Sequence, residues 1–91
     1  MANIGQFKVG KEWTKLEDLT GESFEVDSSY TIQNKEYQPL LVCEGASKPE
    51  GKDIGFIIQQ SQAFGYTCKS GEYLWIRAYQ NVAQFNIAEG I

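Results

Sequence analysis

The sequence predicts an all-β protein: a small β-sandwich or barrel of about seven short strands, with one short helix near the N-terminus. Three observations support this class. Apolar and polar residues alternate with a period of two in several segments. Turn-forming residues recur at intervals of about 8–12 residues. The chain has 91 residues, 42% of them apolar, which suits one globular domain rather than a disordered chain.

The first part of the chain predicts an extended N-terminal arm, residues 1–12, followed by a single β domain, residues 13–91. The arm has two glycines and little periodicity, so it suits either a mobile arm or a short edge strand. Thr14 then begins a capping-box pattern, and Gly21 suits the end of a helix. These residues predict a helix of one or two turns, which Trp13 joins to the core.

The middle of the chain has the pattern of several short strands. Apolar residues alternate with polar ones over residues 22–33, with a bend or a bulge at residues 27–29. Residues 39–44 form a continuous apolar run, as expected of a strand buried on both faces. Residues 55–58 and 64–68 predict two further short strands.

The end of the chain predicts two strands, residues 73–79 and 82–88, joined by a two-residue hairpin at Gln80-Asn81. On one face of the first strand the alternate residues are aromatic or cationic: Tyr73, Trp75, Arg77 and Tyr79. On the opposite face they are aliphatic: Leu74, Ile76 and Ala78. One face therefore belongs to the core, and the other can meet a partner.

The composition argues against an enzyme, a metal site and a cofactor. The chain has no histidine and only two cysteines, which excludes Ser-His-Asp and Cys-His arrangements and four-cysteine zinc sites. Residues 45–53 differ from a phosphate-binding loop in their glycine spacing and in the acid after the lysine. We expect an exposed loop there. The acidic residues between positions 17 and 27 lack the spacing of a calcium loop, which favours a solvated face.

The net charge and the apolar pattern also argue against two classes of partner. A net charge of −4 argues against nucleic acid. No stretch approaches the roughly 20 apolar residues that span a bilayer, so no membrane partner is expected. The first residues lack the apolar run of a signal peptide, which predicts synthesis in a cytosol. In that compartment Cys43 and Cys68 are expected to be reduced and packed in strands, while their spacing leaves a disulfide open.

The aromatic residues have two interpretations, since aromatics fill small β cores and are also enriched in protein interfaces. Arg77 is the only arginine. It suits either a stacking or bidentate contact with a partner or an internal ion pair with Glu25 or Glu44. The candidate interface comprises the residues of the aromatic face and one residue of the arm: Trp75, Arg77, Tyr79, Tyr73 and Phe7.

The order of several short segments resembles small virion structural proteins of tailed bacteriophages and prophages. The segments span residues 13–89: Trp13-Thr-Lys-Leu16, Tyr30-Thr-Ile-Gln-Asn34, Pro39-Leu-Leu-Val-Cys-Glu44, Lys48-Pro-Glu-Gly51, Leu74-Trp-Ile-Arg77 and the closing strand 83–89. The resemblance implies a non-catalytic virion component, made in the host cytoplasm, that decorates the capsid or serves the neck or tail. It implies a homo-oligomer, with a trimer favoured, that binds a major capsid or tail protein. For such a protein we expect the arm, residues 1–12, to reach a neighbour.

Two other functions are compatible with the sequence. The small size and acidic balance also suit a phage-encoded inhibitor of a host protein. Exposed tryptophan and tyrosine would suit a carbohydrate-binding β module.

Overall fold

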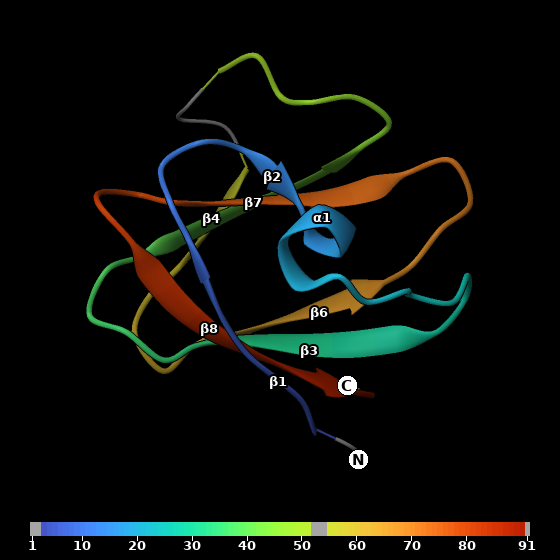
Figure 1. Cartoon of the computed structure of the whole chain (residues 1–91), viewed down its shortest axis with the longest axis horizontal. Coiled ribbons are helices and arrows are strands. Elements are labelled where there is room, and N and C mark those ends of the chain that lie inside the picture. The colour runs from blue at the N-terminus through green and yellow to red at the C-terminus, as the bar shows by residue number, and fades with distance from the viewer. Residues whose placement is uncertain (1–2, 52–54, 91) are drawn as a thin grey trace.

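The computed structural model describes residues 3–51 and 55–90, and within them two four-stranded sheets pack face to face as a β-sandwich (Figure 1). This confirms the predicted fold class, with one strand more than the approximate number expected. The elements are, in chain order, β1 (Asn3–Val9), β2 (Thr14–Lys15), α1 (Leu16–Thr20), β3 (Ser29–Asn34), β4 (Leu40–Gly45), β5 (Phe56–Ile58), β6 (Ala63–Thr67), β7 (Tyr73–Ala78) and β8 (Ala83–Glu89).

The chain crosses between the sheets, and neighbouring strands of each sheet run antiparallel. The first sheet has the strand order β1-β8-β3-β6, and the second has the order β2-β7-β4-β5. The helix α1 touches β1, β2 and β7 and so lies over the side of the sandwich where β1 and β2 are the edges. The edges β5 and β6 lie at the opposite side.

The predicted hairpin at Gln80-Asn81 is wrong, because β7 and β8 belong to different sheets. Each of them already has a partner on both edges: β7 pairs with β2 and β4, and β8 pairs with β1 and β3. The turn therefore carries the chain from one sheet to the other. Asn81 does adopt the left-handed conformation, with φ of 57°.

The core between the sheets is built by alternate residues, as the period of two predicts. In β7 the aliphatic face of Leu74, Ile76 and Ala78 is fully buried in this core. Burying one such large aliphatic side chain contributes about 1.5–3 kcal/mol. The remaining fully buried core residues come mainly from β3, β4 and β8: Ile32, Leu40, Val42, Ala83, Phe85 and Ile87.

The strand β4 is buried on both faces over its first half, which confirms the interpretation of the apolar run. Leu40 and Val42 lie in the main core. Leu41 points to the other face and packs with Trp13 and Trp75 in a second cluster. The second cluster covers the outer face of the β2-β7-β4-β5 sheet.

The described part of the arm, residues 3–9, is the edge strand β1. It pairs with β8 from Asn3 opposite Ala88 to Val9 opposite Ala83, with an irregularity between Asn3 and Gly5. Val9 is buried in the core. The sequence left two alternatives for this segment, a mobile arm or a short edge strand, and the structure shows the edge strand. The first two residues of the arm lie outside the described residues.

The helix has the one to two turns that were predicted, but the predicted capping box at Thr14 is wrong. Thr14 is paired with Ile76 in β2, so its backbone is extended and its hydroxyl donates to the Glu12 carbonyl at 3.1 Å. The residue before the helix is Lys15, whose side chain makes no capping hydrogen bond. The C-terminus follows the prediction: Gly21 is left-handed, with φ of 72°, and its N–H donates to the Glu17 carbonyl.

Residues 21–28 are a loop rather than the predicted strand around Phe24 and Val26. Phe24 is buried and meets the Tyr30 ring edge-on, with 5.0 Å between the centroids. Val26 is exposed at a turn, where Asp27 has a positive φ and donates its N–H to the Cys68 carbonyl. Of the two apolar residues that suggested a strand, only Phe24 is buried.

Asn34, at the end of β3, is fully buried and links two turns. Its amide nitrogen donates to the carbonyls of Gln38 and Ile58 at 2.9 and 2.8 Å, and its amide oxygen accepts the N–H of Glu36 at 2.8 Å. Its backbone carbonyl accepts the N–H of Ser61. These bonds hold the turn between β5 and β6 against the end of β3.

Candidate interaction surfaces

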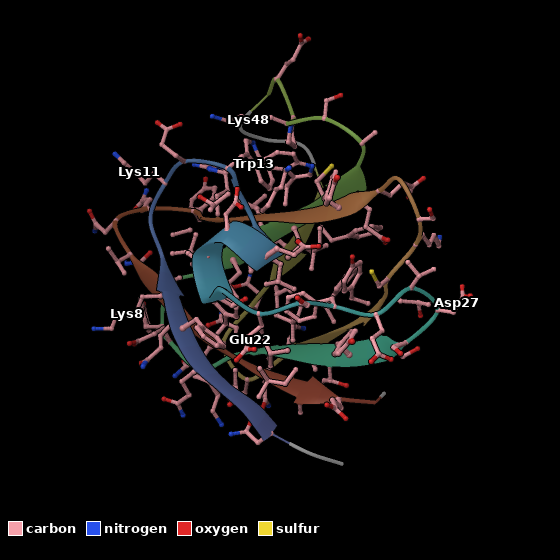
Figure 2. All side chains as sticks on the ribbon, turned by 45° about the vertical axis from the view of Figure 1, so that its right-hand side comes forward. Lys8, Lys11, Trp13, Glu22, Asp27 and Lys48 are labelled. Carbon is pink, nitrogen blue, oxygen red and sulfur yellow. The ribbon has the colours of Figure 1, made fainter. Side chains whose placement is uncertain are left out.

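The outer face of the β2-β7-β4-β5 sheet is covered by the chain itself. The Trp13 indole N–H donates to the Gly51 carbonyl at 2.8 Å, and the Trp75 indole N–H donates to the Gly45 carbonyl at 3.1 Å. The loop that carries Lys48 is thus held beside Trp13 (Figure 2). Both indoles are buried. The exposed tryptophans that motivated carbohydrate binding are therefore absent from the surface, and residues 52–53 of the predicted loop lie outside the described residues.

Arg77 is buried in the same region, with 4% of its surface exposed. Its Nε donates to the Lys11 carbonyl at 2.8 Å and its Nη2 to the Tyr79 carbonyl at 3.4 Å. Its guanidinium carbon lies 5.8 Å from the centroid of the Trp13 ring. The arginine therefore binds backbone carbonyls of its own chain.

The structure does not bring the five candidate interface residues together. Trp75 and Arg77 are buried. Tyr73 is half-buried under the Lys15 ammonium, which lies 4.1 Å from the ring centroid. Tyr79, at the other end of β7, is 45% exposed. Phe7 lies in the other sheet, packed on Phe85 with 6.0 Å between ring centroids.

Two large apolar side chains of β5 are exposed beside β6. Phe56 is 68% exposed and Ile57 is 52% exposed. The Phe56 ring lies 6.0 Å from the half-buried Phe64 ring of β6, centroid to centroid. A shallow cavity of about 340 Å³ is lined by residues of both strands: Phe56, Ile57, Ile58, Gln62, Ala63 and Phe64. We call these residues the β5–β6 edge.

The sequence contains a signal for this surface that lies in its charge distribution and not in its aromatic residues. Residues 55–68 include no Asp, Glu, Lys or Arg, although 22% of the chain is charged. Interface cores are depleted of charged residues, whereas free sheet edges are commonly protected by them. An uncharged segment that contains two short strands therefore indicates an edge without this protection.

The edges on the other side of the sandwich are protected. β1 carries Lys8, which points away from the sandwich (Figure 2), and has an irregularity between Asn3 and Gly5. β2 is two residues long, and α1 follows it directly. Short strands, lysines and bulges are the usual means of blocking edge-to-edge contact. The β5–β6 edge also contains a short strand, the three-residue β5, but it differs in having no charged residue.

A second, polar hollow of about 590 Å³ lies near the ends of β1 and β8. Its lining includes three acids from the loop before β3 and from β8: Glu22, Glu25 and Glu89. Among the described residues, no group of three or more His, Cys, Asp or Glu side chains is arranged to hold a metal ion. The acids predicted to be a solvated face lie partly around this hollow.

Two further polar atoms lie inside the protein. The Tyr66 hydroxyl is buried and has no hydrogen-bond partner among the described residues, as is also true of Oε1 of Glu17. Burial raises the pKa of Tyr66 well above its usual value, and proximity to Cys68 acts in the same direction.

Cys68 is buried in the main core and Cys43 is half-buried on the outer face, both as free thiols.

Comparisons with known proteins add no relative. No family model, no curated protein and no solved structure matches the chain. In the described parts of the chain no helix is long and apolar enough to cross a membrane.

Proposed function

We propose that this chain is a non-catalytic structural protein of a tailed-phage virion that binds copies of itself and other virion proteins. The virion class is supported by the resemblance of segments within residues 13–89. The mode of action is supported by one observation, the exposed and uncharged β5–β6 edge. The chain is made in the host cytoplasm and joins the particle as a decoration, neck or tail protein.

The β5–β6 edge supports a protein partner for two reasons. Exposed apolar side chains that adjoin each other mark binding surfaces more often than single exposed residues do. A free strand edge also offers backbone N–H and C=O groups to an added strand. Phe56 and Ile57 combine both properties on one three-residue strand.

Binding to particles tests this function. We would delete the gene from the phage, purify the particles that lack the chain, and measure co-sedimentation of the purified chain with them. The proposal predicts saturable binding to these particles and none to particles that already carry the chain. Absence of binding, together with recovery of one stoichiometric host protein from lysate, would replace it with the inhibitor function.

A matched pair of variants extends the test to the surface. Ile57→Lys places a charge on the β5–β6 edge, and Val82→Lys places the same charge on an aliphatic residue of almost equal exposure, 54% against 52%. We expect Ile57→Lys to bind particles more weakly than Val82→Lys does. Equal binding by both variants would remove the edge from the particle contact.

A further inference from the structure

We infer that β5 is the strand through which two copies of this chain pair, edge to edge and antiparallel, around a two-fold axis at Ile57. This inference rests on the proposed function, because it names the surface and geometry by which the chain binds itself. It begins from the open edge of the second sheet. Within the described residues, β4 is the only strand paired with β5, with Leu40 opposite Ile58 and Val42 opposite Phe56.

The side chains of β5 suit a covered position better than a solvated one. Ile58 points into the core and is buried, while Ile57 and Phe56 are exposed over half or more of their surfaces. Pairing with a second β5 would place Ile57 opposite its own counterpart, where cross-strand Cβ atoms lie about 4.5–5.5 Å apart. It would also bring Phe56, which already contacts Phe64, next to the partner's Ile58.

The charge distribution selects a second copy as the occupant. The chain has a net charge of −4, so two copies repel each other on average. Residues 55–68 carry no charge, and two such segments can meet without like-charge repulsion. A strongly basic or acidic partner would find no opposite charge there to pair with. The uncharged edge therefore fits a second copy better than it fits a strongly charged partner.

The geometry sets the symmetry of the assembly. Two identical antiparallel strands are related by a two-fold axis, which makes an isologous and closed contact. The expected product is a dimer in which the β2-β7-β4-β5 sheets of two copies become one continuous sheet. This differs from the trimer that the resemblance implies, so the mass in solution separates the two arrangements.

The contact is small, and its strength follows from its size. β5 has three residues, so the contact is below the roughly 800 Å² per partner of a standard stable interface. We expect association in about the micromolar to millimolar range. Copies held side by side on a particle have a high effective concentration, which makes a weak contact sufficient there.

Sedimentation equilibrium of the full chain tests the inference, at concentrations from about 10 µM to 1 mM. We expect a monomer–dimer equilibrium for the wild type and for Val82→Lys, and at least a tenfold weaker association for Ile57→Lys. Circular dichroism would verify that both variants are folded. A wild type that stays monomeric throughout, a trimer, or equal association by the two variants would overturn the two-fold pairing.

A cross-link tests the two-fold axis itself. Ile57→Cys would place two thiols opposite each other, within the reach of a disulfide. Under mild oxidation we expect a covalent dimer for Ile57→Cys and none for the control Val82→Cys, in which the native Cys43 and Cys68 are also present. Equal cross-linking of the two variants would contradict the axis.

The two proposals fail separately. A chain that binds particles but stays monomeric would overturn the β5 pairing and leave the virion function in place. A chain that dimerises through Ile57 but is absent from particles would leave the pairing and overturn the virion function.

Discussion

Replacing Asn34 by alanine is the most informative single test of the fold. The side chain is fully buried and makes three hydrogen bonds, to Gln38, Ile58 and Glu36. One hydrogen bond contributes about 1 kcal/mol net, and a buried carbonyl that loses its donor costs about 1–3 kcal/mol. The bond to the Ile58 carbonyl is itself buried. We therefore expect Asn34→Ala to lower the free energy of unfolding by about 3 kcal/mol or more.

Urea denaturation and thermal unfolding followed by circular dichroism would measure this loss. For a domain of this size, 3 kcal/mol corresponds to a fall in Tm of about 12–24 °C. The matched control is Gln33→Ala, which removes one exposed hydrogen bond to the Ser61 carbonyl and is expected to cost under about 0.5 kcal/mol. A loss under about 1 kcal/mol for Asn34→Ala would refute the role assigned to its amide.

Three further substitutions test the account. Gly55→Ala is expected to cost more than about 2 kcal/mol, because Gly55 has φ of 98° and an added Cβ would overlap the Val42 carbonyl oxygen; urea denaturation checks this, and a neutral result would contradict the backbone course there. Tyr66→Phe is expected to be neutral or to stabilise by up to about 1 kcal/mol, since it removes a buried hydroxyl without a described partner. The folded-state pKa of Tyr66 is raised above its usual value of 10.0, so the wild type should lose stability as pH rises above about 10 more steeply than Tyr66→Phe does; parallel curves of unfolding free energy against pH would exclude this. Arg77→Lys is expected to cost about 2 kcal/mol, because lysine cannot reproduce the bonds to both carbonyls or the planar contact with Trp13; its co-sedimentation with particles should equal that of the wild type, and a selective loss of binding would return Arg77 to the interface.

The sequence predicts those features of the fold that depend on neighbouring residues. The period of two in β7 assigns Leu74 and Ile76 to the core, and the apolar run of β4 indicates burial on both faces. Gly21 marks the end of the helix for a local conformational reason. Each of these depends on side-chain alternation or on backbone preference, which a short segment already contains.

The features that the sequence did not predict depend on distant partners. Nothing in residues 80–81 tells a hairpin from a crossing between sheets, because the difference lies in whether the edges of β7 are already paired. Thr14 fits a capping box by spacing, yet its pairing with Ile76 makes it extended. Asn34 bonds locally to Glu36 and Gln38, but its bond to the Ile58 carbonyl joins residues 24 positions apart, and nothing near Asn34 predicts it.

The candidate interface also combines features that depend on neighbouring residues with features that depend on distant ones. Trp75 and Arg77 have the composition of a contact surface, but the loop at residues 45–51 and Trp13 cover them. That cover comes from segments far away in the sequence. The β5–β6 edge has a local signal, the absence of charge over residues 55–68, and it becomes informative once the strands are known to be edges.

The copy number of this chain in purified phage particles tests the central claim most directly. Quantitative mass spectrometry, with the major capsid protein as the internal reference, would measure it. The account predicts a fixed number per particle: hundreds of copies for a capsid or tail-tube component, and six to a few dozen for a neck, baseplate or fibre component. Particles free of the chain, made in cells that contain it, would contradict the claim.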